Sequence, residues 1–206
     1  QQVIERDNNY LIQRISTKIN ERQDSLQRLG RTLVTQTPNN TGFNDLVNRQ
    51  LSSSADLRAI LWLDQQGNVT GSQEFSHADD MFVPSHNLAS LNDTEQSLIK
   101  LVQDTHKTNF GLISIKNESL LSMVMPIWVD DQINGFILAR FNLSSLLIYS
   151  IPSDIFARYA IALVDQNANI VAGNQAEPGQ SAQDTWKWQS NRKQHTVLSA
   201  LPATND

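Results

Sequence analysis

Residues 3–36 carry apolar side chains at helical spacing. The segment contains no proline, and its apolar residues follow a heptad pattern. The residues of this candidate dimer helix are Ile12, Ile15, Ile19, Leu26, Leu29 and Leu33. Arg22 stands where one more apolar residue is expected. A helix of this length would reach ~50 Å. The helix is predicted to lie along its own domain or to pair with a second copy of the chain. The two arrangements can occur together.

The rest of the chain predicts a mixture of helices and antiparallel strands. Turn residues including Pro38 and Gly42 end the first helix, and a short helix is expected over 43–52. Strands are expected over 57–63, 69–75, 110–115, 120–129 and 135–143, with a further helix over about 92–106. A polar turn is predicted at 130–134, and a partly helical connection over 144–156.

Two hairpin-like stretches have similar sequences. Residues 59–71 (AILWLDQQGNVTG) and 160–172 (AIALVDQNANIVA) align without gaps, so that Asp64 matches Asp165 and Asn68 matches Asn169. In each stretch a polar turn separates two β-prone runs, which is the signature of a hairpin. The similarity predicts two tandem copies of one module. Chance likeness between two ordinary hairpins is the alternative.

The order of these segments points to a known family. The long helix is followed by the hairpin segment at 60–69 and then by SMVMPIWVDDQINGFILARFNLSSLL at 122–147. Together they resemble the Cache domain, also called PDC, an extracytoplasmic PAS-like sensor of bacterial transmembrane receptors. The hairpin that starts at Ala160 resembles the beginning of a second module, as in double Cache sensors. The Tyr, Arg, Trp, Tyr and Asp set of amino-acid-binding members is not found, so the resemblance implies no ligand class.

The resemblance implies an α+β fold. The long N-terminal helix would precede an antiparallel PAS-like sheet of about five strands, with a ligand pocket beneath the loop between the second and third strands. A second, smaller PAS-like module would follow. The expected parts are a stalk helix and linker over 1–42, a membrane-distal domain over 43–147 and a compact or truncated module over 148–206. In family terms the helix continues from a transmembrane span and pairs in a homodimer.

Composition removes several classes of function. The net charge is −5 and the Lys and Arg residues are scattered, which disfavours nucleic-acid binding. The chain has no cysteine, so disulfides and thiolate metal sites are excluded. No apolar run approaches the 18 residues of a membrane span. The chain starts in mid-helix and stops after one strand-like run, so we expect it to be a fragment of a longer protein. The resemblance to Cache sensors implies that this fragment is the periplasmic region of an inner-membrane protein.

Arg140 is the first candidate ligand residue. It lies inside a strand, where a charge is costly unless it is paired or faces solvent. With a period of two it shares a face with Phe136, Leu138 and Asn142. If that face lines the pocket, the guanidinium could clamp a carboxylate ligand; an exposed position on the outer face is the alternative. Aromatic residues that could wall the pocket are Trp62, Phe75, Phe82, Phe110 and Trp128.

The segment His77, Ala78, Asp79, Asp80 is the one local cluster that could hold a cation or titrate in the pocket loop. A solvated polar loop is the simpler interpretation. The four histidines show no metal-ligand spacing, and no nucleophile elbow, phosphate loop or dinucleotide fingerprint occurs. The fragment is therefore predicted to be non-enzymatic, with no metal site and no cofactor.

Two functions remain after these exclusions. The first is a ligand-sensing domain for signal transduction, most simply in a two-component histidine kinase, with a diguanylate cyclase or a chemoreceptor as alternative outputs. It would bind a small molecule and relay binding through helix rearrangement in a dimer. The second is an interaction module that recruits a periplasmic binding protein. A stand-alone enzyme is disfavoured by the lack of a nucleophile constellation.

Overall fold

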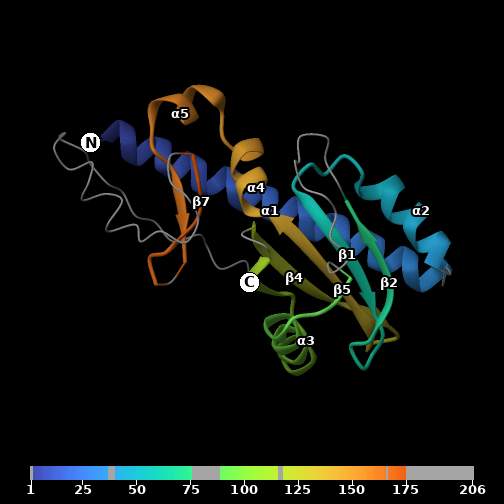
Figure 1. Ribbon diagram of the computed structural model, residues 1–206. Coiled ribbons are helices and arrows are strands. Elements are labelled where there is room, and N and C mark those ends of the chain that lie inside the picture. The colour runs from blue at the N-terminus through green and yellow to red at the C-terminus, as the bar shows by residue number, and fades with distance from the viewer. Residues whose placement is uncertain (1, 37–39, 76–88, 116–117, 166, 175–206) are drawn as a thin grey trace.

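The computed structural model describes residues 2–36, 40–75, 89–115, 118–165 and 167–174 (Figure 1). Its helices are α1 (Gln2–Gln36), α2 (Asn40–Leu51), α3 (Asp93–Thr105), α4 (Leu143–Ser150) and α5 (Ser153–Arg158). Its strands are β1 (Leu57–Leu63), β2 (Val69–Glu74), β3 (Asn109–Ile115), β4 (Glu118–Val129), β5 (Gln132–Asn142), β6 (Ala162–Val164) and β7 (Ile170–Gly173). These elements confirm the order predicted from the apolar pattern.

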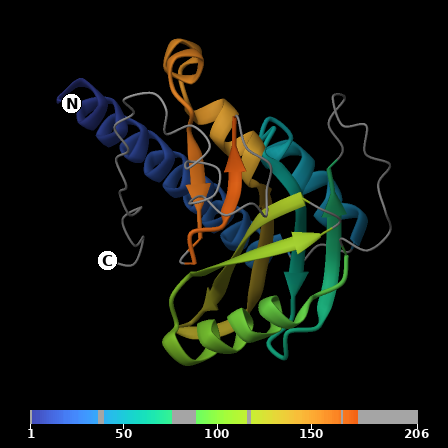
Figure 2. The ribbon, with the colours of Figure 1, turned by 60° about the vertical axis from the view of Figure 1, so that its left-hand side comes forward.

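Five strands form one antiparallel sheet in the order β2-β1-β5-β4-β3. The strand β5 therefore lies in the middle, between β1 from the first hairpin and β4 from the later meander. The long helix α1 and the helix α2 cover one face, and α3 covers the other (Figures 1 and 2). The fold is α+β with a long N-terminal helix and a five-stranded antiparallel sheet, as expected for a PAS-like domain.

The two faces of the sheet belong to two hydrophobic clusters. The face towards α1 and α2 includes Ile60, Met123 and Ile137, and the face towards α3 includes Leu61, Leu138 and Phe136. Because successive side chains of a strand point to opposite faces, a central strand must be apolar at nearly every position to bury both. This explains why β1 and β5 have almost continuous runs of buried residues.

The heptad residues of α1 pack inside the same chain. Ile15, Ile19, Leu26, Leu29 and Leu33 are buried in the cluster on the α1 face, and Ile12 is half-buried. The helix therefore lies along its own domain, which was one of the two arrangements predicted. Arg22 interrupts the pattern because it reaches Asp56 just before β1, through Nη2 to Oδ1 at 2.5 Å and Nε to Oδ2 at 3.1 Å. Its Nη1 also donates to Ser54 Oγ at 2.9 Å.

The connection between β4 and β5 is shorter than predicted. Instead of a turn over 130–134, only Asp130 and Asp131 leave the strands, and both have positive φ, at 46° and 62°. Two residues with positive φ form the hairpin turn that suits the right-handed twist of paired strands, and Asp tolerates this conformation. Nearby, Gly135 has a φ of 151°, and a Cβ there would lie 2.4 Å from the carbonyl oxygen of Leu63.

A second, two-stranded sheet is formed by β6 and β7. This hairpin is not continuous with the five-stranded sheet, and it lies beside α1 and α4 (Figure 2). Ala172 belongs to the cluster on the α1 face, with Leu163 and Val171 packed against it. The phenol of Tyr159 also donates to Asp7 of α1 at 3.1 Å. The segment that leads into the hairpin is therefore bonded to the N-terminal part of the long helix.

Candidate functional site

The face of the sheet towards α3 contains a buried ion pair. Arg140 of β5 and Glu95 of α3 have fully buried side chains. The guanidinium donates through Nε to Oε1 at 2.7 Å and through Nη2 to Oε2 at 2.5 Å. Such a two-pronged geometry gives direction as well as strength to a charge-assisted bond. It holds the N-terminal turn of α3 against the middle strand of the sheet.

The remaining bonding capacity of this ion pair is used by its neighbours. Ser122 Oγ donates to Glu95 Oε1 at 2.9 Å, and Arg140 Nη2 donates to the carbonyl oxygen of Ser90 at 2.7 Å. The backbone N–H of Asn92 donates to Glu95 Oε2 at 3.1 Å, while Asn92 Oδ1 accepts from the N–H of Glu95. This is a capping box, and Glu95, at the third position of the helix, is both its capping partner and the buried charge. Buried charges persist only with such complete pairing.

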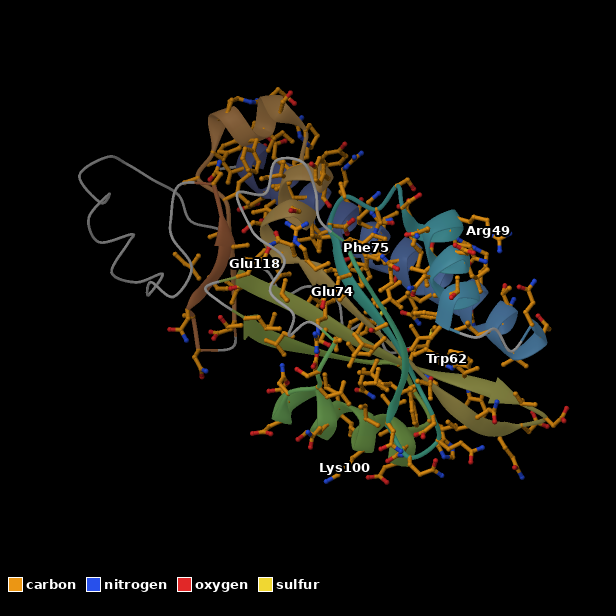
Figure 3. All side chains as sticks on the ribbon, turned by 45° about the vertical axis from the view of Figure 1, so that its right-hand side comes forward. Arg49, Trp62, Glu74, Phe75, Lys100 and Glu118 are labelled. Carbon is orange, nitrogen blue, oxygen red and sulfur yellow. The ribbon has the colours of Figure 1, made fainter. Side chains whose placement is uncertain are left out.

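A second polar group lies on the same face, closer to solvent. Arg58 Nε donates to Glu118 Oε1 at 3.0 Å, and Asn142 Nδ2 donates to the same oxygen at 2.5 Å. Glu118 lies at the end of the sheet closer to the β6–β7 hairpin (Figure 3), and its side chain is 23% exposed, whereas that of Arg58 is 8% exposed. This pair is therefore accessible at its edge, unlike Arg140 and Glu95.

Asn142 links this polar face to the helices that leave it. Its Oδ1 accepts from the N–H of Ser145 at 2.7 Å and so caps α4. Its own N–H donates to the carbonyl oxygen of Asp56, the residue that binds Arg22 of α1. The side-chain amide of Asn142 thus contacts both the partly exposed Arg58–Glu118 pair and the start of α4.

The structure separates the predicted site residues. Arg140 is on the same face as Phe136, Leu138 and Asn142, as predicted, and the alternative of an exposed position is wrong. Trp62, Phe75 and Phe110 instead pack against the cluster on the α1 face, where Trp62 stacks on Phe43 of α2 at 6.0 Å between ring centroids. They are not brought together with Arg140.

Trp128 lies apart from the ion pair, and the predicted loop cluster falls outside the described residues. Trp128 is 44% exposed and lines a surface groove near the C-terminal end of α3, away from the ion pair at the N-terminal end. His77, Asp79, Asp80 and Phe82 lie outside the described residues. The suggestion that they hold a cation stays untested. No group of metal-ligating side chains occurs in the part of the chain that the structure describes.

Sequence reasoning missed Arg58 and Glu118. Arg58 lies in the apolar run of β1, and a charge inside such a run was the same signal that singled out Arg140. Glu95 lies in the first turn of α3, where it completes the capping box, but its pairing with Arg140 depends on a contact between distant parts of the chain. No periodic pattern reveals such a contact.

The fold is that of bacterial chemoreceptor ligand-binding domains. The ligand-binding domain of the Pseudomonas aeruginosa amino acid chemoreceptor PctC, in complex with GABA, is similar with a TM-score of 0.59 at 13% identity, over 90% of this chain and 80% of that one. The PctB domain from the same organism, in complex with L-Gln, has a TM-score of 0.58 at 13% identity, over 91% of this chain and 74% of that one.

A domain of a putative sensory box/GGDEF family protein from Vibrio parahaemolyticus is similar with a TM-score of 0.61 at 18% identity, covering 84% of this chain and 70% of that one. No protein-family model matches the sequence, and no curated protein is similar to it. The structural likeness confirms the PAS-like, Cache-type sensor fold that the sequence resemblance implied. Among the described helices, none is both long enough and apolar enough to span a bilayer.

Proposed function

We propose that this chain is the periplasmic ligand-sensing domain of a transmembrane signalling receptor. The observation that supports the proposal is the polar cluster of Arg58, Glu118 and Asn142 on the α3 face, which reaches solvent at the Glu118 side chain. Ligand sites are typically apolar surfaces with a few well-placed polar groups. Proteins of the same fold are ligand-binding domains, which agrees with this assignment.

The ligand we propose is a small zwitterion that engages Arg58 and Glu118. A carboxylate can replace Glu118 on the guanidinium of Arg58, and an ammonium group can take a place on the Glu118 carboxylate. Similar proteins are described in complex with GABA and with L-Gln, which are both zwitterionic. Arg140 is not a ligand contact in this proposal, because Glu95 already satisfies it with complete burial. It supports the site by holding α3.

Binding is tested by a thermal-shift screen of amino acids, organic acids and amines against the full chain. A ligand that binds only the folded state at 100 times its Kd stabilises that state by about 2.7 kcal/mol. We expect zwitterions to raise the melting temperature more than acids or amines of similar size. Arg58→Gln and Glu118→Gln should each remove the shift.

Arg49→Gln is the matched control, because Arg49 is exposed on α2 at the other face of the sheet (Figure 3). It should keep the full thermal shift. Equal shifts in Arg58→Gln and in the parent would contradict the assignment of the site. A screen without any stabilising compound, combined with capture of a periplasmic binding protein, would favour the interaction module instead.

The wider receptor is also a proposal. We infer membrane anchoring at both ends of the sensor, a homodimer, and the division into 1–42, 43–147 and 148–206. A histidine kinase output stays a prediction; the similar proteins include chemoreceptors and a GGDEF protein, which represent the two alternative outputs. Sequencing the full-length gene tests the membrane anchoring and the output domain, and sedimentation tests the dimer.

A further inference from the structure

A groove lies at the C-terminal end of α3, at the opposite end of that helix from the Glu95–Arg140 pair. It has a volume of about 350 Å³. The residues that line it come from α3 and its C-cap, the β1–β2 turn and the β4–β5 hairpin: Gln65, Gln103, His106, Trp128, Asp131, Gln132, Ile133 and Phe136. This volume is at the lower end of the range for small-molecule sites. The groove is independent of the site proposed above.

The walls of the groove are held by specific contacts. Gln103 Nε2 donates to the carbonyl oxygen of Gln65 at 3.1 Å, which joins α3 to the β1–β2 turn. The ring of His106 meets the Trp128 indole edge-on, with centroids 5.6 Å apart and planes at 87°. His106 is the C-cap of α3, with a φ of 61°. The indole is thus positioned by its neighbours although it is 44% exposed.

The charges of the residues that line the groove favour a cationic ligand. Asp131 carries the only formal charge among the lining residues if His106 is neutral, and neither Lys nor Arg is among them. An exposed indole attracts cations through the negative face of its ring, and the attraction is largest for Trp among the aromatic side chains. A carboxylate beside that ring adds a second attraction of the same sign. An anionic ligand would find no counter-charge in this lining.

We propose that the groove binds a small organic cation of the quaternary or primary ammonium class. The charged nitrogen lies over the Trp128 indole and next to the Asp131 carboxylate, and the apolar part of the ligand packs towards Ile133 and Phe136. The glutamine side chains at the rim accept or donate hydrogen bonds to polar substituents.

The test is a titration of the full chain with choline chloride at constant ionic strength, followed by the NMR signal of the Trp128 indole N–H. We expect saturable binding, and Asp131→Asn should weaken it about tenfold, which corresponds to about 1.4 kcal/mol. Asn tolerates positive φ as well as Asp does, so this variant keeps the turn. Trp128→Leu should abolish binding, read by calorimetry.

Asp130→Asn is the matched control, since Asp130 is the neighbouring turn residue with positive φ but does not line the groove. It should bind choline as the parent does. The proposal is overturned if Asp130→Asn and Asp131→Asn weaken binding equally, if the uncharged isostere 3,3-dimethylbutan-1-ol binds as tightly as choline, or if the indole signal shows no saturable change. None of these results would affect the Arg58–Glu118 site, which is tested by different variants.

Discussion

The hairpins β1–β2 and β6–β7 have the same turn, bond for bond. Asp64 Oδ1 accepts from the N–H groups of Gln66 and Asn68, and Asp165 Oδ1 accepts from those of Asn167 and Asn169, all at 2.8–2.9 Å. Oδ2 of each Asp accepts from the side-chain amide of the matched Asn. The strands share an irregularity too, since Leu63 pairs with Val69 and Val164 with Ile170 just after each register shift.

The surroundings of the two hairpins differ. The first belongs to a five-stranded sheet and its turn packs on α3, where a Cβ at Gly67 would lie 3.4 Å from Ile99. The second forms a two-stranded sheet that rests on α1 and α4. A turn of this kind is therefore encoded within a few residues. The sheet to which its hairpin belongs depends instead on contacts with residues far away along the chain. Because the turn depends only on local residues, duplication of one module stays a prediction, with chance likeness between two hairpins as the alternative.

The largest expected effect comes from Glu95→Ala, which removes the ion pair that holds α3 on the five-stranded sheet containing the first hairpin. The variant leaves Arg140 buried without its carboxylate, so the free energy of unfolding should fall by about 3–5 kcal/mol. Urea denaturation measures the loss. The double variant Glu95→Ala with Arg140→Met should recover part of it. Hydrogen exchange should quicken more in β1–β2 than in β6–β7; an equal change in both would contradict the distinction between them.

Gly135→Ala should have the next largest effect. Its Cβ would lie 2.4 Å from the Leu63 carbonyl oxygen, at a φ of 151° that side chains rarely adopt. We expect about 2–3 kcal/mol of destabilisation. Gly71→Ala is the control, because it introduces the residue found at the matched Ala172, and the nearest atom to its Cβ is a Phe43 ring carbon at 3.1 Å. A larger loss of unfolding free energy in Gly71→Ala than in Gly135→Ala would contradict this prediction. It would show that the backbone shifts to make room for the Cβ at position 135.

Exchanging the turn residues tests the equivalence of the hairpins directly. Gly67 and Ala168 occupy the same position, with φ values of 84° and 61°. Gly67→Ala should destabilise the protein by about 1 kcal/mol, because a side chain disfavours positive φ. Ala168→Gly should stabilise it by about 0.5 kcal/mol, since relief of that strain exceeds the entropic cost of glycine. Thermal unfolding measures both, and effects of the same sign would refute the equivalence.

The smallest effect concerns pH. Hydrogen bonding from the Asn68 side chain holds the pKa of Asp64 below its ordinary value, and the Asn169 side chain does the same for Asp165. A carboxyl whose pKa is lowered by folding contributes stability above its unfolded pKa of roughly 3.9. That stability is lost as the pH falls through the folded pKa. NMR titration should show both carboxyls depressed together; a normal pKa for one of them would break the parallel.

Local chemistry explains what could be predicted. The heptad residues of α1 and the polar turns at Asp64 and Asp165 depend on neighbours within a few positions. The positive φ of Asp130 and Asp131 was missed, because aspartate is a common turn residue and a five-residue turn has a similar composition. The strand predicted over 135–143 therefore began three residues too late, since β5 starts at Gln132.

The candidate site depended on tertiary structure. A charge in a strand had to be paired or exposed, and that argument singled out Arg140 correctly as unusual. Only the packing of α3 on the sheet decided that Glu95 would be its partner. Only the pairing of β5 with both β1 and β4 placed Arg58 beside Glu118 and Asn142. The sequence by itself determined the helices, the strands and the duplicated turn, because these depend on local periodicity and hydrogen bonding. The partners of the buried charges were decided by the fold, because they lie far apart along the chain.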